Sequence, residues 1–434
     1  MDRTLGIYVH IPFCASKCSY CDFYSLTDCD YLMPEYQAAL LKHIEESAES
    51  LLNYEVDSIY FGSGTPSFYG ARRICEVFEQ FKLVGNVRRD AEVTIEVNPD
   101  SVTPDTLKLL RKSGINRLSI GMQASDNNLL KLIGRRHNFQ QVQRAVNEGR
   151  NAGFDNISLD LIYGLPTQTR NDWAETLSKA IELHPEHISC YGLKLEEGTP
   201  MYENYKGSPV LPDDDEQADM YCYAAEQLDR YGYKQYEISN FAAKGFESRH
   251  NLKYWNLEDY IGFGPGAHSC VGRLRYSYIR DIKGYIAGIN RGASIIEEYE
   301  ELTPFERAVE YIMLAMRTIN GMSGHDYSRI CRCDWRPIEH VLMAFREKGW
   351  TELTGDRWHF TVPGFLISNT LIGILVETQA SSRVEGTPWL SDALDAEEKT
   401  SIPMSEEELF REVYEKKLEE SSAESEDTDK ENDQ

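Results

Sequence analysis

The sequence predicts an α/β protein built around a partial (β/α)6 barrel. Short β-branched runs alternate with helix-length stretches through the first half of the chain, which is the rhythm of a parallel sheet assembled from βα units. Six such units are too few for a closed eight-stranded barrel, so an open barrel is one solution and a doubly wound sheet is the other. In both, binding residues gather at the carboxyl ends of the strands.

The individual elements follow from local pattern. The expected strands cover residues 6–11, 58–61, 92–96, 117–120, 156–161 and 187–191. The helix-length stretches between them cover residues 31–52, 71–81, 104–113, 139–152 and 171–183. Thr103 and Pro104 fit the cap and first position of a helix, and Gly114 and Gly153 stand where C-terminal cap glycines belong.

Four regions are expected along the chain. Residues 1–200 form the barrel, 201–300 a Tyr-rich and less regular extension, 301–376 a winged-helix-like domain, and 377–434 an acidic, mostly disordered tail. The extension holds one expected helix at 213–231. In the third region, helices at 304–318, 324–330 and 337–348 precede a hairpin at 351–353 and 357–360 and a helix at 365–375.

Charge and composition narrow the function classes. The net charge is −26, and the segment after residue 376 carries nineteen acidic against six basic residues, so half of the excess lies in the tail. No basic stripe indicates nucleic acid. The longest near-apolar stretch, 365–376, is too short to span a bilayer, although peripheral membrane contact stays open. No signal peptide opens the chain, and its ten cysteines are scattered, so we expect a cytoplasmic, reducing setting.

Three cysteines stand apart from the rest. Cys14, Cys18 and Cys21 fall within eight residues after the first strand, at a spacing that lets three thiolates meet one small object. Iron–sulfur clusters are usually held by four thiolates, so three would leave one iron open. A zinc site would need a fourth Cys or His at paired spacing, and no second pair follows. Zinc and unligated thiols remain the alternatives to a [4Fe–4S] cluster.

The run from Tyr8 to Phe23 resembles the radical S-adenosylmethionine superfamily and, more narrowly, the oxygen-independent coproporphyrinogen III oxidase-like family. The resemblance covers residues 5–376. Further matching motifs follow in one order at 61–66, 94–99, 119–123, 160–166 and 236–242. It implies that S-adenosylmethionine chelates the open iron and that the reduced cluster cleaves it to a 5′-deoxyadenosyl radical.

The resemblance also implies a cradle for this ligand. The first S-adenosylmethionine would be bound by Tyr8, Gly62, Ser63, Gly64, Thr65 and Glu96. A second would be bound by Gln123, Arg135 and Asp160, with Tyr20, Gly64 and Thr65 beside them. Ser63 replaces a glycine that is usual in the family, and Arg136 is the alternative to Arg135. An ordinary loop, a surface acid at Glu96 and a structural network at Asp160 are the competing interpretations.

Two features of the sequence, one missing cysteine and one matching motif, point to one branch of that family. The oxidases carry a fourth cysteine one residue after the third, whereas Asp22 and Phe23 follow Cys21 here. That pattern resembles the HemW branch of haem chaperones, as does the motif from Arg249 to Trp255. In that branch His250 would ligate haem, the cargo, because neutral imidazole is a common axial ligand. His268 is the other candidate in the region.

The expected function is therefore a haem-binding chaperone that delivers haem to apo-proteins, and a homodimer is possible. The alternative is a coproporphyrinogen III oxidase that decarboxylates its substrate to protoporphyrinogen IX. A radical enzyme acting on an unrelated substrate is the third possibility.

Overall fold

The computed structural model describes residues 3–381, and its centre is one twelve-stranded sheet. Most of the predicted acidic tail lies outside the described residues. Six strands pair in parallel and in chain order, so the order never reverses, as a partial barrel requires and a doubly wound sheet forbids. They are β1 (Thr4–Ile11), β2 (Glu55–Ser63), β3 (Asn86–Val97), β4 (Arg117–Gln123), β5 (Ile157–Tyr163) and β6 (His187–Gly192).

Two kinds of side chain alternate along these strands. One set is apolar and packs into the main core, for example Ile7, Val9 and Ile59. The other set is largely polar and lines a cavity on the opposite face, for example Tyr60, Glu96 and Asp160. Because successive strand residues point to opposite faces, one sheet serves both a dry core and a polar interior.

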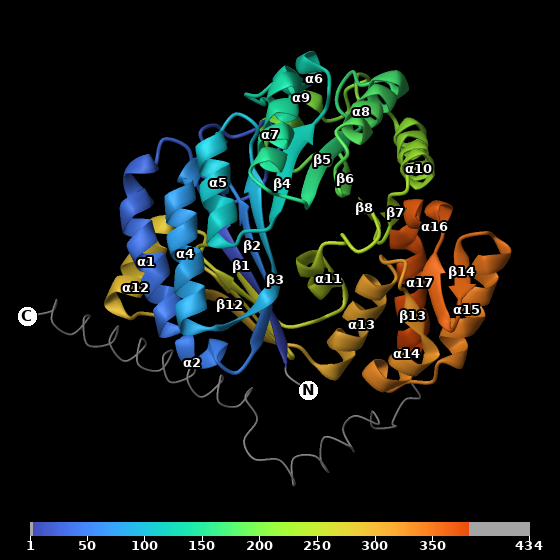
Figure 1. Ribbon diagram of the computed structural model, residues 1–434. Coiled ribbons are helices and arrows are strands. Elements are labelled where there is room, and N and C mark those ends of the chain that lie inside the picture. The colour runs from blue at the N-terminus through green and yellow to red at the C-terminus, as the bar shows by residue number, and fades with distance from the viewer. Residues whose placement is uncertain (1–2, 382–434) are drawn as a thin grey trace, which may run out of the picture.

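The helices that connect these strands cover the apolar face (Figure 1). They are α1 (Met33–Glu46), α2 (Ala48–Leu51), α3 (Pro66–Tyr69), α4 (Ala71–Val84), α5 (Pro104–Ser113), α6 (Asn127–Leu132), α7 (Phe139–Asn151) and α8 (Arg170–Glu182). Thr103 caps α5 with a capping box, and Gly114 ends it at φ 113°, as the sequence predicts. The predicted helix 31–52 is divided at Ser47 into α1 and α2.

The region 201–300 is more regular than the sequence indicated. It contains the helices α9 (Pro200–Tyr205), α10 (Asp214–Arg230), α11 (Arg249–Trp255) and α12 (Ile282–Arg291). It also adds six strands: β7 (Lys234–Gln235), β8 (Asn240–Ala242), β9 (Tyr260–Phe263), β10 (His268–Val271), β11 (Leu274–Tyr278) and β12 (Ile296–Glu301). These strands are two to six residues long and extend both edges of the sheet. β9 and β8 join it by pairing with the distant strands β1 and β6, whereas β10 and β11 form a local hairpin.

The C-terminal part forms a second, smaller core. Its elements are α13 (Pro304–Ala315), β13 (Met322–Ser323), α14 (Gly324–Cys331), α15 (Arg336–Glu347), β14 (Thr351–Thr354), β15 (Arg357–Phe360), α16 (Val362–Leu366) and α17 (Ser368–Ser381). The predicted helices and hairpin are present, and β13 pairs with β15 to complete a three-stranded sheet. This part contacts α10 and α11 (Figure 1). Nowhere in residues 3–381 is a helix long and apolar enough to cross a membrane.

Candidate cofactor site inside the open barrel

A cavity of about 460 Å³ occupies the polar interior of the barrel. All three cysteines of the predicted cluster motif line it, together with most of the predicted cradle. The lining residues of that predicted set are Cys14, Cys18, Tyr20, Cys21, Ser63, Gly64, Thr65, Glu96, Gln123, Arg135 and Asp160. The other three, Tyr8, Gly62 and His250, do not line it. Segments from four strands and three loops therefore meet at this cavity.

The cysteine loop, residues 12–25, is fixed against the end of β2. The Gly64 N–H donates to the Ile11 carbonyl at 2.9 Å, and the Thr65 N–H donates to the Phe13 carbonyl at 2.8 Å. A Cβ atom added at Gly64 would lie 2.7–2.9 Å from backbone atoms of Ile11 and Phe13. Gly64 is thus required by close packing of the loop itself, in addition to any role toward a ligand.

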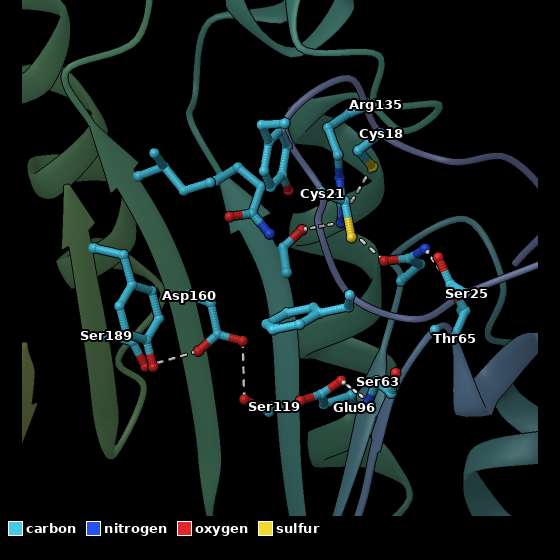
Figure 2. Close-up of a pocket in the computed structure, with 18 of the residues that line it drawn as sticks. Cys18, Cys21, Ser25, Ser63, Thr65, Glu96, Ser119, Arg135, Asp160 and Ser189 are labelled. Atoms are coloured by element: carbon cyan, nitrogen blue, oxygen red, sulfur yellow. Dashed lines mark hydrogen bonds between the residues drawn. The ribbon is translucent and has the colours of Figure 1, made fainter. Parts of the chain in front are cut away.

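The three thiols lie at one end of this cavity, beside a guanidinium (Figure 2). Arg135 Nη1 lies 3.6 Å from Cys18 Sγ, and Cys14 Sγ lies 3.4 Å from Thr65 Oγ1. Burial raises the pKa of Cys14 and of Cys21, so metal binding there must displace protons. All ten cysteines are free.

The thiols fit an iron–sulfur cluster better than a single ion. Residues 3–381 contain no group of three or more His, Cys, Asp or Glu side chains close enough to hold one metal ion. Zinc would need its sulfur ligands about 2.3 Å from a common centre. In a cluster each thiolate binds its own iron, so thiols that line one cavity without converging on a point suit it. The adjacent guanidinium would offset the negative charge of the thiolates.

Glu96 is half-buried, and its carboxylate already has two hydrogen-bond donors. It accepts hydrogen bonds from the Tyr60 hydroxyl at 2.9 Å and from the Ser63 N–H at 3.1 Å. Burial raises its pKa to about 7, against the lowering effect of the Tyr60 hydrogen bond, and the charge of Asp160 adds to the rise. The side chain is therefore not the exposed salt-bridge acid that was the competing interpretation, and it presents a titratable carboxyl group to the cavity.

Arg135, rather than Arg136, faces the cavity. Its Nη2 donates to Asn98 Oδ1 at 2.8 Å and to the Gly121 carbonyl at 3.0 Å. The Arg136 side chain is 55% exposed and lies 3.5 Å from Asp100. Asn98 in turn donates to Thr65 Oγ1 at 3.2 Å, so one chain of polar contacts links Arg135 to Cys14. The sequence alone could not choose between two adjacent arginines.

Gln123 ends β4 in the left-handed region, with φ 63°. A side-chain carbon added at the neighbouring Gly121 would lie 2.8 Å from Gln123 Nε2 and 2.7 Å from Arg135 Nη2. The two predicted ligand residues are therefore packed over Gly121, where their polar ends meet. Backbone strain of this kind concentrates at binding sites.

Asp160 sits in a ring of serines. Its carboxylate accepts from Ser119 Oγ at 2.9 Å and from Ser189 Oγ at 2.8 Å (Figure 2). Burial raises its pKa, and the two serine hydroxyls oppose that rise. The structural network that was the competing interpretation is thus present, and the same carboxylate also lines the cavity.

Ser63 has a strained backbone conformation at a position where the resembling family carries glycine. Its φ is 91°, in the region that favours glycine. Its hydroxyl lies 2.8 Å from His10 Nε2, which also lies 2.8 Å from the Tyr24 carbonyl. Burial lowers the pKa of His10 to about 4, so this imidazole is neutral and holds the cysteine loop in place.

Tyr8 and Gly62 stand behind the cavity wall. The Tyr8 ring stacks against Tyr60, with centroids 6.4 Å apart, and its hydroxyl lies 3.4 Å from His10 Nδ1. A Cβ atom at Gly62 would lie 2.8 Å from the Tyr60 ring and 3.1 Å from Glu96 Oε1. Both residues therefore support Tyr60 and Glu96, which do line the cavity.

His250 lies on α11, beneath Tyr60, and is 1% exposed. Its Nδ1 is 3.0 Å from Ser58 Oγ, and its Nε2 is 2.8 Å from Tyr254 Oη. Burial lowers its pKa to about 3, so the ring is neutral. Both ring nitrogens are therefore engaged in hydrogen bonds. His268, at the start of β10, is exposed.

Sequence reasoning missed several cavity residues. Tyr60, Asn98, Arg117 and His187 all line the cavity. Arg117 has the same strand parity as Ser119 and Gln123, so the two-residue period of β4 was a usable signal. Nothing local marks His187, whose ring is hydrogen-bonded to Ser158 and Tyr236.

The comparisons with known proteins agree with this geometry. The model of the Radical SAM superfamily matches residues 8–180. A crystal structure of coproporphyrinogen III oxidase (HemN) from Escherichia coli, described as a radical SAM enzyme, matches at a TM-score of 0.76. That match covers 86% of this chain and 90% of the oxidase chain at 22% identity, so it is evidence for the fold alone. Fold and site together define a radical SAM protein.

Curated relatives identify the family within that class. The heme chaperone HemW of Bacillus subtilis is 34% identical over 369 residues, which is 84% of this chain and 97% of the relative. HemW of Escherichia coli is 32% identical over 381 residues, covering 86% and 98%. The chain belongs to the HemW family.

Proposed function

We propose that this chain is a haem chaperone, which binds haem and delivers it to apo-proteins while holding a [4Fe–4S] cluster and S-adenosylmethionine. The observation that carries the proposal is similarity over nearly the whole length of relatives named heme chaperones. The missing fourth cysteine supports it, because Asp22 and the 68% exposed Phe23 follow Cys21. We place the protein in a reducing compartment, which suits its ten free cysteines. The proposal also includes transfer of haem by a homodimer.

Each cavity residue has a task in this proposal. Cys14, Cys18 and Cys21 would hold the cluster, and Arg135 would balance the charge of the thiolates. When bound, the reduced cluster supplies the electron that cleaves S-adenosylmethionine. Glu96, once ionised, would accept hydrogen bonds from the ammonium group of that ligand. The barrel walls would limit the access of water to both ligands.

His250 is the proposed haem ligand, with one condition. Its neutral imidazole is the form that binds iron, but Nε2 must first release the Tyr254 hydroxyl, or Nδ1 the Ser58 hydroxyl. Asn251, the next residue of α11, already lines the cavity. Haem ligation by His250 therefore requires a rearrangement of α11, whereas the exposed His268 would require none.

Haem titration of the anaerobically reconstituted protein tests the proposal. Haem that is retained through gel filtration is measured as its pyridine complex, and difference spectra report a Soret shift. We expect one haem per chain, with loss of the shift in His250→Ala and retention in the matched control His268→Ala. No retained haem contradicts the chaperone proposal. A shift that is lost only in His268→Ala reassigns the ligand.

One observation keeps the oxidase as a second candidate. The fold of coproporphyrinogen III oxidase covers 86% of this chain, and the polar residues of the cradle line one cavity. An anaerobic assay with coproporphyrinogen III, S-adenosylmethionine and a reductant distinguishes the two functions. We expect no protoporphyrinogen above the level without enzyme. Catalytic turnover would reverse the ranking.

A further inference from the structure

Arg117 is a buried arginine without a direct partner. Its residue is 2% exposed, and its Nε has no hydrogen-bond partner. Within residues 3–381 its side chain makes no hydrogen bond or ion pair. Burial acts to lower its pKa, but the nearby charges, of which Glu92 has the largest effect, together outweigh burial and raise the pKa, so the guanidinium is charged. A buried charge with unused donors is costly unless a ligand completes it.

Two carboxylates, Glu92 and Asp160, act on the charge of Arg117, but both accept hydrogen bonds from other groups. Glu92 accepts from the backbone N–H groups of Arg249 and His250, at 3.1 and 3.0 Å. Asp160 accepts from Ser119 and Ser189. Glu92 and Asp160 both balance the charge of Arg117 at a distance. Neither carboxylate accepts a hydrogen bond from the guanidinium, so its N–H groups remain available to a ligand in the cavity.

Arg117 lies at the end of the cavity opposite to the cysteines. It is the first residue of β4, whereas Gln123, beside the cluster motif, is the last. His187, the first residue of β6, and Asn251 of α11 line the cavity with it. We call these three residues the floor. In the register of the sheet Arg117 pairs with Thr94 and Ser119 with Glu96, so the floor lies about 7 Å along the strands from Glu96 and about 20 Å from Gln123.

We propose that Arg117 is a carboxylate-binding residue at the floor of the cavity, and that the carboxylate is a propionate of haem. A guanidinium fork matches a carboxylate in shape and charge, and the pair would use the free Nε–H and Nη–H donors. This inference rests on the proposed haem-binding function. S-adenosylmethionine is the other carboxylate source, because Glu96, which would bind its ammonium group, lies only two residues along the strands from the level of Arg117.

Haem and haem dimethyl ester test the inference on the reconstituted full chain. The two molecules share the ring and the iron, and only the first has carboxylates. We expect wild-type protein to bind haem roughly 10- to 100-fold more tightly than the ester by equilibrium dialysis. Arg117→Gln should weaken haem binding by a similar factor and bind both molecules alike. Arg117→Lys, which keeps the charge but loses the fork, should fall between them.

Controls separate this inference from its alternatives. Arg144→Gln, at a 51% exposed side chain, should leave both affinities unchanged. Equal wild-type affinity for haem and its ester contradicts the inference without any variant, even where Arg117→Gln folds poorly. Weaker binding of S-adenosylmethionine in Arg117→Gln, with haem unaffected, assigns the carboxylate to that ligand and overturns the propionate. Wild-type protein that binds neither haem nor ester contradicts the proposed function, whereas haem binding that is indifferent to propionates contradicts only this inference.

Discussion

The two ends of the cavity are built from the same parallel strands, yet they use polar side chains in different ways. At the cysteine end, Arg135 is tied to Asn98 and the Gly121 carbonyl and lies against Cys18. At the floor, Arg117 has no direct partner, while the neighbouring His250 has one on each ring nitrogen. The cysteine end is organised around three thiols. The floor lies beside α11, whose His250 imidazole is hydrogen-bonded at both nitrogens. Changes at the first should therefore affect the cofactor, and changes at His250 should affect stability.

The largest expected effect is loss of the cluster. Cys18→Ala removes one of three thiolates, so iron and sulfide retained after anaerobic reconstitution should fall to background. Cys75→Ala is the matched control, because that thiol packs in the main core, 3.9 Å from the Leu109 carbonyl, and lies outside the cavity. Unfolding should change little in either variant. Iron retained by Cys18→Ala at the wild-type level would remove the distinction between the two ends.

The next largest effect is at α11. His250→Ala deletes a buried ring and leaves the Ser58 and Tyr254 hydroxyls without their partner. The free energy of unfolding should fall by on the order of 3 kcal/mol, as measured by denaturant titration. Cluster content should stay at the wild-type level, with His268→Ala as the exposed control. A parallel loss of iron in His250→Ala would show that the two ends are not independent.

Glu96 lies between the two ends and predicts a pH dependence. Because burial raises its pKa to about 7, the carboxyl group is neutral below that pH and ionised above it. Binding of S-adenosylmethionine should strengthen about fivefold from pH 6 to pH 8 and weaken as the pH falls again. Glu96→Gln should flatten this profile in equilibrium dialysis. For folding the sign is opposite, since the contribution of Glu96 to stability is present below pH 4.5 and is lost as the pH rises through about 7.

The smallest effect is expected at Ser63. Glycine would relieve the strain of φ 91° but would lose the hydroxyl contacts to His10 and the Tyr24 carbonyl. These terms oppose each other, so Ser63→Gly should stay within about 1 kcal/mol of wild type in unfolding. Ser63→Ala, which keeps the strain and loses the contacts, should be the less stable of the two. The reverse order would mean that the backbone strain is negligible.

Much of the cysteine end could be predicted because its residues are near in sequence or lie at strand ends. Cys14, Cys18 and Cys21 share one loop, and Glu96 and Gln123 close their strands, where parallel topology gathers side chains. The choice of Arg135 over Arg136 could not be predicted, since adjacent residues differ only in where the tertiary structure turns them. Of the edge strands, β8 and β9 pair with β6 and β1, which are remote in the chain, so no local pattern marks them. β10 and β11 form a local hairpin, which the sequence reasoning missed.

The parallel βα architecture, the cluster motif and the family could be predicted from the sequence, because periodicity and motif spacing are local properties of the chain. The surroundings of His250 and Arg117 could be learned only from the fold. Ser58 and Tyr254 close around His250, and Arg117 is left without a partner at the floor. Whether a buried polar group is satisfied depends on residues brought together from distant strands and helices, and no local pattern records that.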